Sequence, residues 1–340
     1  MNTFAGTALC AAGGLAGAVF ALPLRGVKGW KYESGWFVYA IAGLVAFPLL
    51  LALATVNDLF GVIGGADAKT LGACFGFGAL WGIGGLSWGL MIRYLGIGLG
   101  LAIGCGLCSA AGTLIPPLVQ GRAADLVKDT AAIVTLASVA VSLVGIVLVG
   151  LAGRMKEGEL DEETKKKAVA DFDFKKGMTV AVFSGLASAG MNFGLQSGGA
   201  MEAAAKAGGT ADAWAGMPVL VVVLWGGFAV NAAWCLWQNA KNKSFGDYAA
   251  ARPANWFFAA LAGVIWAMQF ACQKTGEPAM GEMGYIAFAV VMGSCVLFSS
   301  LLGMAMGEWK GTGAKTKGAL AAGLAALAAS IALAVAAKTI

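Results

Sequence analysis

The sequence lacks histidine and has few charged side chains. None of its 340 residues is histidine, and 12% are Asp, Glu, Lys or Arg, against about 25% in soluble domains. Without histidine, neither a Ser/His/Asp triad nor a histidine-ligated zinc site can be assembled. We therefore expect a protein that is not an enzyme and that uses no metal ion or other cofactor.

Two further absences exclude functions that depend on nucleotides or nucleic acids. No glycine-rich stretch is followed by the Gly-Lys-Ser/Thr of a phosphate-binding loop, so nothing indicates an ATP-driven pump. The net charge of +5 is small and is scattered over short connections, without a basic stripe. Because nucleic-acid binding requires such a stripe, we expect no nucleic-acid partner.

The seven cysteines predict neither disulfide bonds nor a metal site. Their number is odd, and all lie within apolar segments, which is not the pattern of a disulfide framework. Cys105 and Cys108 have C-x-x-C spacing, but no second pair accompanies them. We interpret them as buried thiols.

Apolar residues are abundant and lie in long runs. The chain is 59% hydrophobic, with a mean hydropathy of +0.79. Runs of about 20 apolar residues cross a bilayer as helices, and these runs lack the alternation of a membrane β-barrel. We predict an all-α polytopic membrane protein with ten transmembrane helices. The predicted spans are 3–23, 35–55, 70–91, 97–117, 131–152, 177–197, 215–237, 254–273, 283–306 and 316–337.

The positive charges predict the orientation of these spans. Seventeen Lys and Arg residues lie in or just after the odd-numbered connections, and five lie in the even-numbered ones. Because Lys and Arg accumulate on the cytoplasmic side, the odd connections are expected in the cytoplasm. Both termini of this multi-pass chain are then expected outside the cytoplasm.

A charged stretch divides the chain into two halves. Residues 154–176 contain seven basic and seven acidic side chains, and we predict a cytoplasmic linker loop there. The flanking regions, 1–153 and 177–340, are each predicted to form a five-helix repeat. Since an odd number of spans makes the halves enter the membrane in opposite directions, the pattern is that of the inverted repeats of secondary transporters.

Neutral polar and aromatic residues lie within the predicted spans, whereas the acidic residues lie in connections or near span ends. Aromatic rings pack against the C–H faces of a sugar, and amides donate and accept hydrogen bonds with its hydroxyls. We predict a sugar site lined by residues that share helix faces. They are Trp81 and Trp88; Asn192 and Gln196; and Trp266, Gln269 and Gln273.

The alternative for each of these residues is a structural role. Amides join transmembrane helices, and tryptophans anchor helices at the membrane interface. We interpret the tryptophans nearer to span ends as such interfacial residues. They are Trp30, Trp36, Trp214, Trp256 and Trp309.

Several motifs spread along the chain fit one family pattern. They are 79–84 (ALWGIG), 91–96 (MIRYLG), 112–114 (GTL), 188–191 (SAGM) and Trp266 with 269–270 (QF). On these motifs the sequence resembles the bacterial L-rhamnose-proton symporter family of the drug/metabolite transporter superfamily. The resemblance implies ten helices and proton-coupled import of L-rhamnose or a closely related sugar across the inner membrane.

The absence of histidine leaves carboxylates as the groups that could carry a coupled proton. Glu202, Glu277 and Glu282 flank predicted spans, and we predict that proton coupling uses one of them, the alternative being solvated loop charges. Two other functions stay open. One is a carrier of the same fold for another neutral solute or coupled to sodium, and the other is a membrane sensor that transports nothing. The expected partners are a sugar, a proton or sodium ion, and the lipid bilayer.

Overall fold

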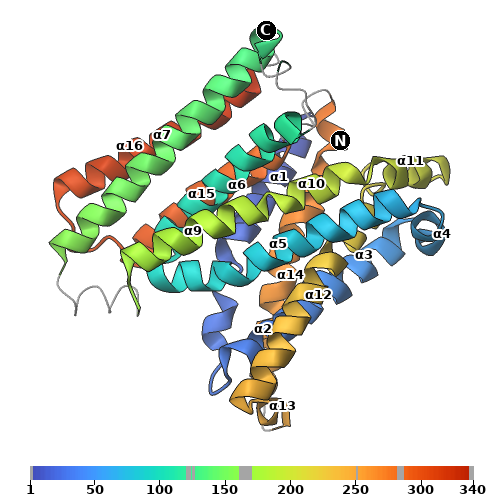
Figure 1. Ribbon diagram of the computed structural model, residues 1–340, viewed down its shortest axis with the longest axis horizontal. Coiled ribbons are helices and arrows are strands. Elements are labelled where there is room, and N and C mark those ends of the chain that lie inside the picture. Colours follow the sequence, from blue (N-terminus) through green and yellow to red (C-terminus); the bar gives the residue numbers. More distant parts are fainter. Residues whose placement is uncertain are drawn as a thin grey trace. The chain divides into compact units, whose positions relative to one another are not determined.

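The computed structural model (Figure 1) describes residues 3–119, 124, 127–160, 171–249, 252–281 and 287–336, and within these ranges the regular structure is helical, without strands. Nine helical segments of this part are long and apolar enough to cross a membrane. An apolar helix satisfies its own backbone hydrogen bonds, which is what the hydrocarbon core of a bilayer demands. The chain is therefore an all-α, multi-pass membrane protein.

The helices of the first half begin and end close to the predicted spans. They are α1 (Thr3–Val19); α2 (Tyr32–Ala40), η2 (Ile41–Ala46) and α3 (Phe47–Thr55), which follow one another directly; α5 (Ala68–Leu95); α6 (Ile97–Val119); and α7 (Thr130–Glu159). Helix α6 contributes the shorter apolar stretch Ile97–Gly112 in addition to the nine segments.

The second half repeats this correspondence. Its helices are α9 (Phe174–Ser188) and α10 (Gly190–Ser197), α12 (Met217–Asn242), α14 (Pro253–Gly276), α15 (Ala287–Ala305) and α16 (Ala314–Ala336). Short helices lie in the connections: η1 (Pro23–Gly26), α4 (Leu59–Gly64), α11 (Gly199–Ala207) and α13 (Gly246–Ala249).

The predicted linker is partly helical where the structure describes it. Helix α7 continues to Glu159 and α9 already begins at Phe174. Asp173 caps α9 by accepting a hydrogen bond from the backbone N–H of Lys176 at 2.9 Å, a common way to satisfy the free amides of a first helical turn. Hydropathy places helix ends where charge begins, but polar residues can extend a helix beyond that point.

The chain divides into two compact units, each built from both halves of the sequence. Unit 1 comprises Met1–Ile83 and Gly190–Gly281, and unit 2 comprises Gly84–Ala189 and Glu282–Ile340. In unit 1, α14 packs against α1 and α2, and α12 packs against α2. In unit 2, α7 packs along α16, and α6 packs against α15 and α9.

Candidate functional site

Unit 1 contains a continuous stack of buried aromatic rings from three helices. Trp36 and Tyr39 of α2 stack with ring centroids 4.5 Å apart, and Tyr39 meets Trp266 of α14 edge-on at 6.4 Å. Trp266 in turn stacks on Trp81 of α5, with centroids 4.9 Å apart and ring planes 22° from parallel. We call Trp36, Tyr39, Trp81 and Trp266 the aromatic stack. It brings together two of the predicted sugar-site residues, Trp81 and Trp266.

Glycines allow these helices to approach closely enough for the rings to meet. A Cβ atom added at Gly227 of α12 would overlap the ring of Trp81. A Cβ at Gly43 of η2 would overlap the backbone of Gly263 in α14. Small residues at such crossings are how transmembrane helices reach backbone contact, so the stack depends on these glycines.

Two of the predicted amides lie on the same face of α14 as Trp266. Gln269 and Gln273 lie three and seven residues after it, at helical spacing, and both are buried. The Gln273 Oε1 atom is fully buried and accepts no hydrogen bond from the described residues. A buried carbonyl oxygen normally has a donor, so Gln273 presents an acceptor that a hydroxyl of a bound molecule could fill.

The remaining predicted residues are placed differently. Asn192 is buried in α10, whose first residue, Gly190, lies against the backbone of Trp81. Gln196, one turn later, is exposed. Trp88 belongs to unit 2, where its Nε1 donates to Ser188 Oγ at 2.7 Å.

Trp36 was wrongly assigned to the membrane interface, because the structure buries it in the stack. Its Nε1 donates to Asn231 Oδ1 at 2.8 Å, and Asn231 Nδ2 donates to the carbonyl of Gly227. The prediction also omitted Tyr39. The spacing of Trp36 and Tyr39, three residues apart in an apolar run, is the signal that could have identified both as one buried face.

Two of the predicted coupling carboxylates surround a buried lysine at the end of α14. Lys274 Nζ lies 3.1 Å from Glu202 Oε2 and 3.2 Å from Glu277 Oε2, and the Lys274 side chain is 7% exposed. Lys206 also contacts Glu202, at 3.5 Å. Glu202 and Glu277 are therefore ion-paired, and their side chains remain 24% and 35% exposed. Glu282 lies outside the described residues.

Sequence reasoning missed a buried carboxylate in unit 1. Glu33, in the first turn of α2, is 4% exposed. Its Oε1 accepts hydrogen bonds from Asn242 Nδ2 at 2.9 Å and from Ser244 Oγ at 2.8 Å. Because it follows two lysines and a glycine-rich turn, its sequence context resembles that of a loop, and its partners are about 210 residues away.

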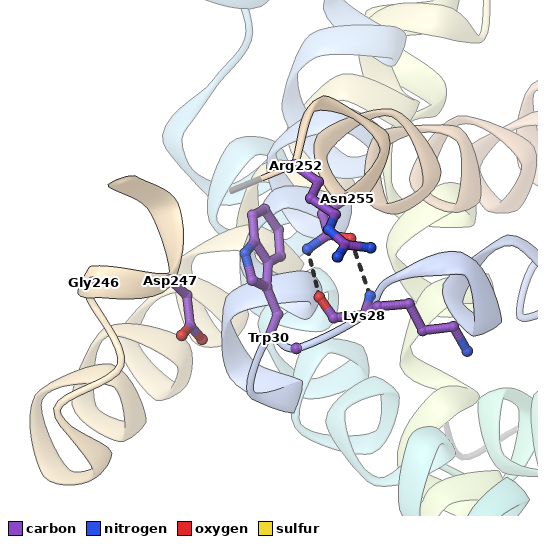
Figure 2. A pocket seen from close by; sticks show the side chains of 7 residues that line it. Lys28, Trp30, Gly246, Asp247, Arg252 and Asn255 are labelled. Carbon is purple, nitrogen blue, oxygen red and sulfur yellow. Dashed lines mark hydrogen bonds between the residues drawn. The ribbon is translucent and has the colours of Figure 1, made fainter. Parts of the chain in front are cut away.

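A polar pocket of about 490 Å³ opens between the 28–30 and 246–255 segments of unit 1. Figure 2 shows Asn255 holding the pocket wall, since its side chain accepts from the backbone N–H of Lys28 and donates to the Lys28 carbonyl. Trp30 lies beside it, and its buried Nε1 donates to none of the described residues. None of the seven predicted sugar-site residues lines this pocket.

Unit 2 also buries a lysine that hydropathy had assigned to the linker. Lys156 of α7 is 1% exposed, and its Nζ lies 5.0 Å from the ring centroids of both Phe172 and Trp309. Trp309 is likewise buried, so its assignment to the membrane interface was wrong. Nearby, Glu308 accepts hydrogen bonds from the backbone N–H groups of Ile97 and Gly98, which caps α6.

The cysteines are free, and six of the seven are buried, which confirms that Cys105 and Cys108 are buried thiols. Cys105 Sγ lies 3.6 Å from Cys295 Sγ. Within the described ranges, no group of three or more His, Cys, Asp or Glu side chains is placed to hold a metal ion.

Comparison with known proteins identifies relatives along nearly the whole chain. The profile of the L-rhamnose-proton symport protein family matches residues 4–337. The L-rhamnose-proton symporter of Klebsiella pneumoniae (strain 342) is 31% identical over 318 residues, covering 92% of this chain and 91% of the relative. That of Pectobacterium carotovorum is 33% identical over 310 residues, covering 89% of each. No solved structure matches the chain.

Proposed function

Because the chain belongs to the L-rhamnose-proton symport family, we propose that it imports L-rhamnose or a closely related sugar together with protons by alternating access. The match over residues 4–337 is the observation that carries this proposal. The match spans both units, so it is not limited to one shared segment of the chain. A carrier that moves its solute without converting it is not an enzyme.

The proposed architecture has ten spans arranged as two inverted repeats, 1–153 and 177–340, joined by the segment 154–176. Nine apolar helical segments support it, and α6 supplies the tenth span as a 23-residue helix. Such a helix is about 35 Å long at 1.5 Å per residue, enough to cross the hydrocarbon core. The bias of positive charge toward odd connections supports periplasmic termini in a bacterial inner membrane.

The proposed sugar site uses Trp81 and Trp266 as an aromatic platform and the amides of α14 as hydrogen-bonding groups. Trp266, Gln269 and Gln273 share a face, and the Gln273 Oε1 is buried without a donor among the described residues. A sugar hydroxyl supplies such a donor. Asn192, Gln196 and Trp88 complete the proposed set.

The proposed coupling site is the cluster around Lys274, which directly follows Gln273 in α14. Protonation of Glu202 or Glu277 would neutralise one of the two carboxylates that hold the Lys274 ammonium. The resulting shift of Lys274 would be transmitted along the helix to Gln273, one residue away. Glu282 remains a further candidate, and Glu33 is added as a buried carboxylate without a cationic partner among the described residues.

Uptake of labelled L-rhamnose into proteoliposomes tests the substrate and the coupling separately. We expect counterflow without a gradient, and accumulation when the outside is made more acidic than the inside. Absence of counterflow would refute rhamnose as substrate and favour another neutral solute or a sensor. Uptake that does not respond to the pH gradient but responds to a sodium gradient would identify sodium, and not the proton, as the coupling ion.

The same assay, applied to matched substitutions, tests which residues bind the sugar and which couple the proton. Gln273→Leu should reduce counterflow at least about tenfold, since one buried hydrogen bond is worth about 1.5 kcal/mol. Gln238→Leu, in α12 and outside the proposed site, is the control with the same chemical change, because the Gln238 Oε1 is likewise buried without a donor among the described residues. Glu202→Gln and Glu277→Gln should abolish the pH dependence while preserving counterflow, whereas Asp212→Asn, at an exposed residue paired with Lys206, should alter neither. Equal effects in each pair would overturn the assignments.

A further inference from the structure

A second pocket lies in unit 2, between the end of α15 and the first turns of α16. It has a volume of about 570 Å³. Its lining is mainly apolar and includes Met304, Leu320 and Leu324, together with the ring of Trp309. Two lysines, Lys310 and Lys317, complete the lining. The combination of an apolar wall and two cations distinguishes it from the polar pocket of unit 1.

The charged and apolar parts of this pocket are separated along the helix. Lys310 lies in the turn after α15, and Lys317 lies in the first turn of α16. Leu324 follows Lys317 by seven residues, which is about 10 Å along an α-helix. The pocket is therefore cationic at the loop end and apolar toward the centre of a transmembrane helix.

The two lysines are available to an external anion. Both are exposed, and neither has a carboxylate within 4.0 Å in the part of the chain that the structure covers. The Glu159 carboxylate accepts from Gly313 N and Thr316 Oγ1 at 2.7 and 2.6 Å and forms no ion pair with either lysine.

A third cation lies behind the pocket wall. Trp309 lines the pocket, and the buried Lys156 ammonium lies 5.0 Å from the Trp309 ring centroid. This ammonium has no hydrogen-bond acceptor among the described residues. The buried Glu308 carboxylate opposes this charge electrostatically, so the preference of the pocket for an anion depends on Lys310 and Lys317.

We propose that this pocket binds an anionic phospholipid, with its phosphate at Lys310 and Lys317 and an acyl chain along Met304, Leu320 and Leu324. Basic pockets between transmembrane helices recognise anionic headgroups, and the apolar wall fits an acyl chain. The predicted orientation puts the 306–313 connection in the cytoplasm, so the lipid would come from the inner leaflet. This inference requires only that the protein spans a membrane, and it does not depend on the transported solute.

Native mass spectrometry of the purified, delipidated full-length protein tests the proposal, with phosphatidylglycerol and phosphatidylcholine of matched acyl chains as probes. The wild type should retain phosphatidylglycerol preferentially. The Lys310→Gln/Lys317→Gln double variant should retain about tenfold less, since each lysine contributes on the order of a several-fold preference. Lys315→Gln, at an exposed lysine that does not line the pocket, is the matched control and should retain as much as the wild type.

Two further arms separate a lipid from a free anion. Ala321→Trp, which fills the apolar wall but keeps both lysines, should also lower phosphatidylglycerol retention, and inorganic phosphate should not displace the lipid. Equal retention of both lipids, or undiminished phosphatidylglycerol in the double variant, would overturn the proposal. If phosphate displaced the lipid and Ala321→Trp retained as much lipid as the wild type, the pocket would be a site for small anions and not for a lipid.

Discussion

Each unit buries one lysine among its described residues, and the two are held in different ways. In unit 1 the Lys274 ammonium lies between the carboxylates of Glu202 and Glu277. In unit 2 the Lys156 ammonium lies over the rings of Phe172 and Trp309 and has no hydrogen-bond acceptor in the described part. Unit 1 thus holds its buried charge in direct ion pairs. Unit 2 holds it over aromatic faces, and the buried Glu308 carboxylate attracts it electrostatically without a hydrogen bond to it.

This difference shows that the free-energy cost of burying a charged side chain depends on the groups that surround it. An ion pair that is taken out of water depends on both partners being present, so removal of one leaves the other exposed to the full desolvation cost. Removal of a cation that lies over rings leaves no directly paired carboxylate behind. The same substitution should therefore destabilise unit 1 more than unit 2.

The largest effect is expected for Lys274→Met. The change leaves Glu202 and Glu277 without their shared cation, and we expect a loss of about 2 to 3 kcal/mol in the free energy of unfolding, below the figure for a fully enclosed pair because the carboxylates are partly exposed. Urea unfolding in mild detergent measures it. Lys206→Met, which removes an exposed partner of Glu202, should cost less than about 1 kcal/mol. Similar losses in both variants would contradict the distinction.

A smaller effect is expected from the tryptophan hydrogen bonds of the two units. Trp36→Phe keeps a ring in the stack but leaves the Asn231 Oδ1 atom without the indole N–H that it accepts from, at a cost of about 1 to 2 kcal/mol. Trp88→Phe in unit 2 removes a bond to Ser188 Oγ, and a hydroxyl can rotate toward another partner. The unfolding free energy should fall less for Trp88→Phe, and the reverse order would show that the hydroxyl is the more constrained acceptor.

Lys156→Met should change stability by less than about 1 kcal/mol in either direction. The substitution removes attraction to two rings, worth about 1 to 2 kcal/mol, but it also removes the cost of burying an ammonium. Thermal unfolding of Lys156→Met beside Lys274→Met provides the direct comparison. A loss as large as that of Lys274→Met would mean that the electrostatic attraction of Glu308 holds Lys156 as strongly as direct ion pairs hold Lys274.

The smallest effect concerns the exposed helix caps, for which the units should behave alike. Backbone and side-chain hydrogen bonds from Lys176 lower the pKa of Asp173 in unit 2, and hydrogen bonds from Thr70 lower the pKa of Asp67 in unit 1. Since the folded-state pKa is lowered, each cap stabilises at neutral pH, and its contribution is lost as the pH falls through that pKa. Asp173→Ala and Asp67→Ala should differ from the wild type at pH 7 and converge with it in acid. A difference that persists at low pH would assign the effect to helix propensity.

The helices could be predicted from the sequence because each apolar run is long enough to decide its own structure. The interruptions could not. A π-helical turn at Ile41–Ala46 interrupts the helix that contains Tyr39, and α10 follows α9 after a break at Ala189. These irregularities occur where η2 meets Gly263 and where α10 meets the α5 backbone, so they depend on a second helix that no local window includes.

Part of the arrangement of the candidate site could be predicted from the sequence. Helical spacing grouped Trp266, Gln269 and Gln273 on one face, and the structure buries all three, while their role in sugar binding stays a prediction. The pairing of Trp81 with Trp266 joins residues 185 positions apart, which spacing within one helix cannot reveal. The burial of Lys274 was missed for the same reason. Glu202 lies 72 residues away, and the Lys274 ammonium can be buried because that carboxylate lies beside it.

The aromatic stack also gives the protein an internal optical signal. Two indoles whose centroids lie 4.9 Å apart and whose planes are 22° from parallel are close enough to couple their intense far-ultraviolet transitions, which predicts a paired band in circular dichroism. Any ligand that separates Trp81 from Trp266 would reduce that band. The protein can therefore report occupancy of this position without a label, in detergent or in vesicles, through the two side chains that its glycines bring together.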